Sequence, residues 1–175
     1  MNKTVFHVCT HTTKNYIENC DSDLIVLIIP FSDPIAEEND IQILCTQSLH
    51  DGFSLHNLFQ ELKTIKKHPK MVFKTYANVI YSYGKDRFIS LCKEVGISGL
   101  IIPDIPFEEK EEFIDTCIQY QVSLIPTVAS NSLKRIKKVV PTNAPYVYLS
   151  CRVQDDQNTA IEQIKKHTSA YIIKR

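Results

Sequence analysis

The stretch that decides the fold is Leu24-Ile-Val-Leu-Ile-Ile-Pro-Phe-Ser-Asp-Pro-Ile-Ala-Glu-Glu-Asn-Asp-Ile-Gln42. It opens with an unbroken apolar run, which is typical of a parallel strand buried on both faces. A proline ends the run, an acidic loop follows, and the sequence then continues as a polar helix. In α/β barrels the functional site lies just past the carboxyl ends of the strands, so this loop is the first candidate site.

Short β-rich runs alternate with helix-length amphipathic segments along the rest of the chain, which predicts parallel strands joined by helices. The predicted strands are Thr4–Val8, Asp23–Ile29, Met71–Tyr76, Gly99–Ile102, Val122–Thr127 and Pro145–Ser150, and Tyr171–Ile173 could open another. Ser54 is the expected N-cap of a helix with Leu58, Phe59 and Leu62 on one face. The fold class is therefore predicted as α/β, an incomplete TIM (β/α)8-type barrel of about six βα units in one domain, residues 1–175. A complete barrel typically needs about 250 residues.

Composition excludes several classes of function. The formal net charge is zero, which gives no attraction to nucleic acid or to a membrane surface, and the apolar runs are too short to span a bilayer. The first residues lack the features of a signal peptide, so a cytoplasmic location is expected. The six cysteines include no Cys-x-x-Cys pair and are expected to be reduced and mostly buried. His7, Cys9 and His11 alternate on a predicted strand, but no metal is expected there.

Several ordered motifs carry a resemblance to a known family. Val26–Asn39 is similar to the pattern Glu-Leu-Gly-(Ile/Val)-Pro-Phe-Ser-Asp-Pro-Leu-Ala-Asp-Gly-Pro of the tryptophan synthase α subunit. Thr75–Val79, Gly96–Glu109 and Tyr146–Ser150 resemble that family's third, fourth and sixth strands with the residues that follow them. These pieces occur in the family's order and at nearly its spacing over roughly residues 23 to 150.

The resemblance implies a lyase of tryptophan biosynthesis. The family cleaves indole-3-glycerol phosphate into indole and glyceraldehyde 3-phosphate and passes indole to a β subunit that carries pyridoxal phosphate. The α subunit itself uses no cofactor, and none is expected here. The reaction needs one carboxyl group that moves protons, a second that accepts the indole N–H, and donors that hold the phosphate.

The first of these groups is missing. The family's proton-transferring glutamate aligns with Val26, and Ile28 replaces a family glycine on the same face of the strand. Both positions are predicted to be core rather than pocket. The second carboxylate aligns with Glu37, which is a weak candidate catalytic residue. The alternative interpretation makes Glu37 and Glu38 solvated loop acids near a helix start.

Part of the pocket wall is retained. Tyr76 matches a tyrosine that packs against indole, while Asn78 and Asp104 match residues that order the neighbouring loops. Lys74 stands where the family is apolar, and an unpaired ammonium would be costly in an indole pocket. We expect Lys74 either to extend to the rim or to pair with a nearby carboxylate.

The glycines of the family's phosphate site are not found. The sixth loop reads Cys151-Arg-Val-Gln-Asp-Asp-Gln-Asn158, without glycine. The chain is therefore interpreted as a truncated, degenerate family member and a pseudoenzyme. Its expected interface with a β subunit is Pro30, Phe31, Ser32, Asp33 and Pro34.

Three further possibilities stay open. The chain could be an aldolase or lyase with a re-assigned base, for which Glu37, Asp104 or Lys74 are the candidates, because a strand lysine can form Schiff bases. It could self-associate through open sheet edges, with Tyr171–Ile173 left uncovered. It could also fold poorly and have no activity.

Overall fold

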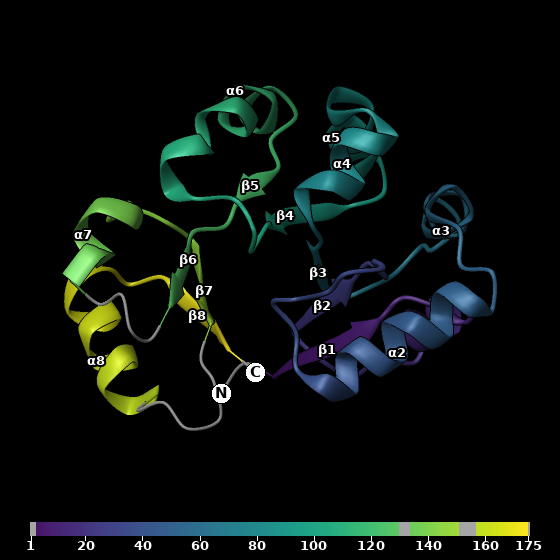
Figure 1. The fold of residues 1–175 in the computed structure, drawn as a ribbon, viewed down its shortest axis with the longest axis horizontal. Helices are drawn as coiled ribbons and strands as arrows, with labels where there is room; N and C mark the ends of the chain where they lie inside the picture. The colour runs from purple at the N-terminus through teal and green to yellow at the C-terminus, as the bar shows by residue number, and fades with distance from the viewer. Residues whose placement is uncertain (1–2, 130–133, 151–156, 175) are drawn as a thin grey trace. The chain divides into compact units, whose positions relative to one another are not determined.

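The computed structural model describes residues 3–129, 134–150 and 157–174. These residues form two compact units, Met1–Leu124 and Ile125–Arg175, called here the first and second units (Figure 1). Each unit is a parallel sheet whose strands alternate with helices along the chain. All paired strands run parallel, which agrees with the predicted fold class.

The first unit holds a five-stranded sheet in sequential order. Its strands are β1 (Thr4–Val8), β2 (Leu24–Ile28), β3 (Lys70–Lys74), β4 (Ile97–Ile101) and β5 (Ser123–Leu124). Its helices are α1 (Thr13–Glu18), α2 (Asn39–His50), α3 (Leu55–Leu62), α4 (Ala77–Tyr83), α5 (Lys85–Glu94), the 3-10 turn η1 (Phe107–Glu109) and α6 (Glu111–Gln119). Sequential order in a parallel sheet is the pattern of repeated βαβ units.

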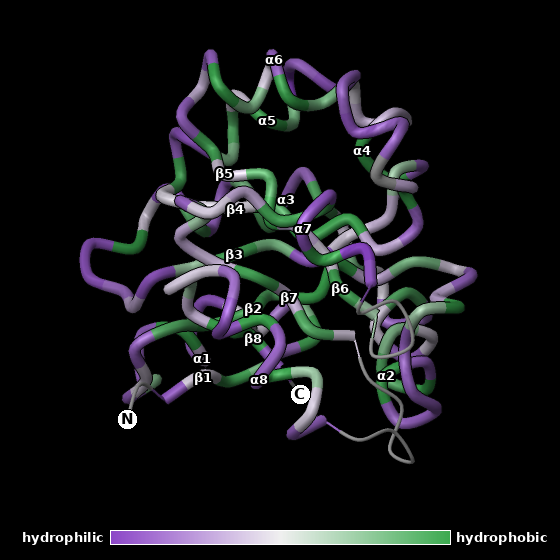
Figure 2. Tube along the Cα trace, turned by 90° about the vertical axis from the view of Figure 1, so that its left-hand side faces the viewer, coloured by the Kyte–Doolittle hydropathy of each residue, from purple (hydrophilic) through white to green (hydrophobic). Residues whose placement is uncertain are grey.

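Every residue of β2 is buried, as the apolar run predicts for a strand covered on both faces. Alternate residues of β2 serve two different cores. Ile25 and Leu27, together with Ile29 just after the strand, pack with helix residues such as Phe59 and Phe88 in the main cluster. Ile28 packs instead with Val8 of β1 and with Ile41 and Cys45 of α2. Figure 2 shows β2 and β3 as hydrophobic segments, whereas the helices alternate between hydrophobic and hydrophilic residues.

The second unit is a three-stranded parallel sheet in the order β6 (Thr127–Ala129), β7 (Tyr146–Ser150) and β8 (Tyr171–Lys174), with α7 (Ile136–Val139) and α8 (Gln157–His167) between them. Its core is small and centres on Val147, Leu149, Ala160 and Ile164. Ile173 is fully buried and Tyr171 packs edge-on against Tyr146. The expectation that this terminal segment has nothing to cover it is therefore wrong.

Most predicted strands are confirmed to within two residues at each end. The exception is Val122–Thr127, where two short strands, β5 and β6, lie in different sheets on either side of Ile125 and Pro126. Proline has no backbone N–H to donate to a sheet, so it interrupts the ladder. Ser54 caps α3 as predicted, with its hydroxyl accepting the Asn57 N–H at 3.4 Å. No helix among the described residues combines the length and apolar character needed to cross a bilayer.

Candidate functional site

The carboxyl ends of β2 and β3 lie side by side and carry the candidate site. The register pairs Ile28 with Lys74, and the Ile29 N–H donates to the Lys74 carbonyl at 3.0 Å. The chain then leaves β2 as a loop of residues 30–38, called here the β2–α2 loop. Pro30 and Pro34 are buried within it, whereas Ser32 and Asp33 are exposed. The loop stays over the ends of the two strands.

Val26 is completely buried, at 0% exposure. In the sheet it lies between Phe6 of β1 and Val72 of β3. Ile28, two residues on, is 1% exposed and belongs to the apolar cluster under α2. Both positions are core, as predicted, and neither side chain can exchange a proton.

Glu37 and Lys74 form a buried ion pair. Lys74 Nζ lies 2.6 Å from Glu37 Oε1, and the two side chains are only 3% and 2% exposed. The second of the two expectations for Lys74, pairing with a carboxylate, is therefore confirmed. The interpretation of Glu37 as a solvated loop acid is wrong, because the loop folds back over β3 and encloses it. Of the two glutamates, only Glu38 is exposed.

Tyr76 follows β3 and holds the same loop. It is 3% exposed, its hydroxyl accepts the Ala36 N–H at 2.9 Å, and its ring stacks on Phe31 with 5.0 Å between ring centroids. Burial raises the pKa of the Tyr76 phenol above its ordinary value. Tyr76 is thus a neutral hydrogen-bonding group whose oxygen and ring both contact the loop.

Cys45 is a member of this group that sequence reasoning missed. It lies on α2, is fully buried and packs against Ile28. Burial is the main cause that raises the pKa of its thiol, and the Glu37 carboxylate adds to the rise. The only sequence signal was its apolar spacing from Ile41 on one face of the polar helix.

Asn78 follows Tyr76 by two residues, whereas Asp104 lies in the loop after β4 and contacts the start of α4. Both carboxylate oxygens of Asp104 lie 3.1 Å from the backbone nitrogen of Ala77, which donates to them at the start of α4. Asp104 thereby supplies the helix cap that Tyr76, at the N-cap position, does not make. Asn78 is exposed in the first turn of α4. A loop-ordering contact is observed for Asp104, while that role stays a prediction for Asn78.

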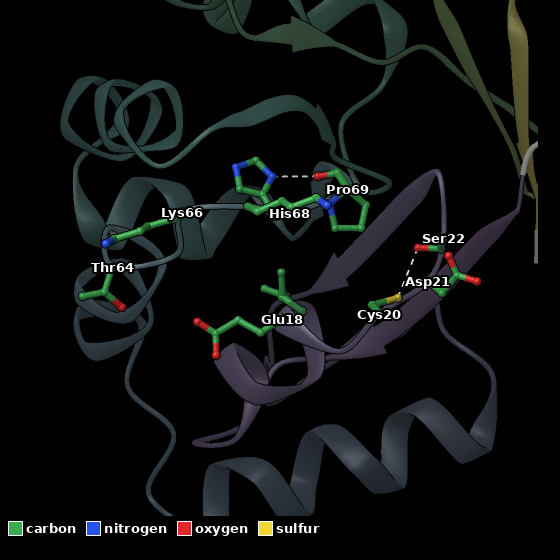
Figure 3. A pocket seen from close by; sticks show the side chains of 10 residues that line it. Glu18, Cys20, Asp21, Ser22, Thr64, Lys66, His68 and Pro69 are labelled. Atoms are coloured by element: carbon green, nitrogen blue, oxygen red, sulfur yellow. Dashed lines mark hydrogen bonds between the residues drawn. The ribbon is translucent and has the colours of Figure 1, made fainter.

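A separate cleft of about 670 Å³ lies at the opposite, amino-terminal ends of β2 and β3 (Figure 3). It is lined by Ile17, Glu18, Cys20, Asp21, Ser22, Thr64, Lys66, Lys67, His68 and Pro69. His68 Nδ1 lies 2.7 Å from the Pro69 carbonyl oxygen and Cys20 Sγ lies 3.2 Å from Ser22 Oγ. Acidic and basic side chains both line the cleft, so its charge favours no single class of ligand.

The described residues contain no group of three or more His, Cys, Asp and Glu side chains placed to hold a metal ion. The five described cysteines are free, and all but Cys20 are buried. Residues 151–156 of the predicted sixth loop, which include Arg152, Asp155 and Asp156, lie outside the described residues, and Gln157 and Asn158 begin α8.

Comparison with known proteins adds a family relationship to this geometry. The family model for the tryptophan synthase alpha chain matches residues 7–171. The chain is 35% identical over 162 residues to the tryptophan synthase alpha chain of Thermoanaerobacter sp. (strain X514), covering 89% of this chain and 62% of that protein. It is 32% identical over 166 residues to that of Clostridium kluyveri, covering 92% and 62%. The chain thus spans under two thirds of the length of these relatives.

Solved structures show the same relationship. The tryptophan synthase alpha subunit of Campylobacter jejuni superposes with a TM-score of 0.85 at 27% identity, covering 99% of this chain and 77% of that one. A chain of the tryptophan synthase complex of Pyrococcus furiosus superposes with a TM-score of 0.88 at 25% identity, covering 99% and 76%. These matches confirm the predicted α/β fold of TIM-barrel type with parallel strands.

Proposed function

Because this chain belongs to the tryptophan synthase alpha chain family, we propose that it is an α-type protein of tryptophan biosynthesis that lacks lyase activity of its own. The observation that carries the proposal is Val26, fully buried at the position of the family's proton-transferring glutamate. Aldol cleavage of indole-3-glycerol phosphate requires a proton to leave a glycerol hydroxyl and a proton to reach the indole ring carbon. A valine can serve neither transfer, and general acid–base help is worth about 10²–10⁴ in rate.

The remaining polar groups support this proposal because they already have partners. Glu37 is paired with Lys74, the Tyr76 hydroxyl accepts the Ala36 N–H, and Asp104 accepts the Ala77 N–H. The alternative of a re-assigned aldolase would have to draw on Glu37, Asp104 or Lys74. A Schiff base requires an amine that is free to attack a carbonyl, whereas the Lys74 Nζ is buried and lies 2.6 Å from the Glu37 carboxylate.

The direct test is release of indole from indole-3-glycerol phosphate by the purified chain. We expect no turnover above background, whereas a complete family member assayed in parallel should form indole readily. A rate within about tenfold of that enzyme would overturn the proposal, since it would exceed what remains after general acid–base help is lost.

We also propose that the β2–α2 loop binds a tryptophan synthase β subunit. The segment Pro30–Pro34 keeps the family sequence, and its Ser32 and Asp33 are exposed, with the Ser32 hydroxyl donating to Asp33 at 2.9 Å. Two Pyrococcus furiosus structures in the comparison are described as tryptophan synthase complexes. The ion pair of Glu37 and the stack of Phe31 would hold this segment in one conformation.

Co-elution with a β subunit and calorimetry test the association. We expect weak binding that Asp33→Ala reduces. Asp21→Ala, a matched change of an exposed aspartate at the other end of the strands, should leave the binding unchanged. Absence of binding at tens of micromolar, or equal affinity for the two variants, would contradict this interface.

Self-association is a further proposal for the isolated chain. Three large apolar side chains are strongly exposed on the β2–α2 loop and α2, namely Ile35 (82%), Ile43 (67%) and Leu44 (51%), and the strand order leaves β1 at one end of the first sheet. Exposed apolar surface and sheet edges both favour association. Light scattering should show a mass that rises with concentration, and a constant monomer mass would contradict it.

A further inference from the structure

The Lys74–Glu37 pair has no counterpart among the other ion pairs of the described residues. The Lys63–Glu94 pair, at 3.0 Å, has side chains that are 32% and 54% exposed, whereas Lys74 and Glu37 are 3% and 2% exposed. Charged groups are rarely buried unless they are paired, because each loses its hydration. Within this first unit, the contact between Lys74 and Glu37 therefore offsets part of the hydration that both charged groups lose.

The pair is also part of a clamp on the β2–α2 loop. Lys74 is the last residue of β3, and Tyr76 follows it two residues later. They contact neighbouring loop residues, since Lys74 pairs with Glu37 and Tyr76 accepts the Ala36 N–H. Tyr76 also stacks on Phe31 at the start of the loop. The loop is thus attached near both of its ends to Lys74 of β3 and to Tyr76, which follows β3.

We propose that Lys74 is an internal ligand of Glu37, which closes the β2–α2 loop over β3 and excludes an external N–H heterocycle from that carboxylate. This inference rests on the proposed function, because the family has at the position of Glu37 the carboxylate that accepts the indole N–H. Lys74 then acts on specificity, because it turns a ligand-binding carboxylate into a structural one.

Lys74 has a physical advantage over a neutral heterocycle as the partner of Glu37. The ammonium brings a full positive charge to 2.6 Å from Glu37 Oε1, whereas a neutral heterocycle brings one uncharged N–H. Burial strengthens the Coulomb attraction further because the local dielectric is lower than that of water. A neutral ligand cannot displace Lys74 at ordinary concentrations.

Removing the Lys74 side chain should reverse this exclusion. Lys74→Ala deletes the four atoms beyond Cβ and leaves a space bordered by a carboxylate without its cation. Such a space accepts a ligand that fills it and supplies a donor. The probes are indole and benzofuran, which have the same shape and differ in an N–H against an oxygen. A ligand selected by Glu37 must be the one with the N–H.

Calorimetric titration of the full chain with both probes is the test. We expect the parent chain to bind neither probe, and Lys74→Ala to bind indole at least tenfold more tightly than benzofuran. The control Lys63→Ala, which opens the exposed pair, should bind neither. Lys74→Ala/Glu37→Ala should lose the preference for indole. Binding of indole by the parent chain, equal binding of both probes by Lys74→Ala, or binding of neither by a folded Lys74→Ala would each overturn the inference.

A second measurement keeps the inference testable if Lys74→Ala does not fold. Glu37→Gln keeps the shape of the side chain but removes its charge, and hydrogen exchange at the Ala36 N–H reports closure of the loop. We expect that amide to exchange at least tenfold faster than in Glu94→Gln, the matched change in the exposed pair. Equal exchange in the two variants would show that the ion pair does not close the loop. Neither experiment measures lyase turnover, so a result against this inference would leave the proposed lack of lyase activity unaffected.

Discussion

A valine in place of a glutamate at position 26 alters the stability of the sheet as well as its chemistry. Val26 is 0% exposed and lies between β1 and β3 in the sheet. A carboxyl group placed there would lose its hydration, and the described strand neighbours Phe6 and Val72 offer no side-chain hydrogen bond in return. Restoring the family residue would therefore place a buried acid in an apolar core.

We expect Val26→Glu to destabilise the chain by about 3 kcal/mol or more and not to restore indole formation. Urea denaturation gives the first quantity and the indole assay the second. Ile43→Glu introduces the same residue at a position that is 67% exposed and should change stability by about 0.5 kcal/mol or less. A variant with full stability and clear lyase turnover would show that the site is intact apart from this residue.

The buried His7 makes the folding stability of the chain depend on pH. Burial lowers the pKa of its imidazole from 6.5 to about 4, while Nε2 lies 3.1 Å from Thr13 Oγ1 and the ring stacks on Tyr16 at 3.9 Å. Between these two pH values the unfolded chain binds a proton that the folded chain does not. The stabilising contribution of neutral His7 is therefore complete above pH 6.5 and is lost as the pH falls toward 4.

Stability measured by denaturation across that range should fall less steeply in His7→Gln than in the parent chain. His56→Gln, which changes an exposed histidine of α3, should keep the parent's slope. If His7→Gln also kept that slope, another group would be responsible for it.

The sequence predicts that Lys74 needs a partner, but it cannot identify Glu37 as that partner. Burial of an ammonium is costly for any lysine on an interior face, and this limits Lys74 to the rim or to an ion pair. The choice between these depends on the course of the β2–α2 loop, which is fixed by Pro30, Pro34 and the contacts of Tyr76. Those contacts join segments far apart in the chain, so no local pattern reveals them.

Among the helices and strands, α4 is also stabilised by a contact that its local sequence does not reveal. Ala77–Tyr83 contains Asn, Val and Tyr residues of modest helix propensity, and its own sequence does not predict a helix. Its first N–H is satisfied by Asp104, from the loop after β4. When the capping residue of a helix comes from a distant loop, the sequence of the helix itself contains only part of the information that predicts it.

Asp104→Ala should destabilise the chain by about 1 kcal/mol, the typical value for losing a helix-capping side chain. The amide of Ala77 should exchange faster, while amides of the neighbouring α5 should change little. Asp115→Ala, an exposed aspartate on α6, serves as the control. Unchanged exchange at Ala77 would mean that the cap contributes nothing to α4.

At the scale of the whole molecule, the βα rhythm predicts the parallel α/β class, and the family motifs lie in the order of the strands. The alternation of strands and helices does not predict the division into two compact units between Leu124 and Ile125. The sequence from Val122 to Ile125, which is apolar except for Ser123, predicts one strand, and Pro126 gives only a local reason for its end. The expectation of a single domain over residues 1–175 stays a prediction.

The two units differ in the size of their cores, and this should appear in their local stability. The main cluster of the first unit gathers buried aromatic residues, including Phe59, Phe73 and Phe88, with ring centroids 5.6 to 6.1 Å apart. The cluster of the second unit contains only aliphatic residues, such as Val147 and Ile164. A smaller core buries less apolar surface and opens at a lower free energy.

Native-state hydrogen exchange of the intact chain should therefore show faster exchange in β7 than in β3, although both are central strands of their sheets. Val147→Ala removes two buried methyl groups and should lower stability by about 1–3 kcal/mol. Its effect on exchange should be confined to β6, β7 and β8 if the second unit opens by itself. Equal acceleration of exchange in β3 would show instead that the two units open together as one cooperative structure.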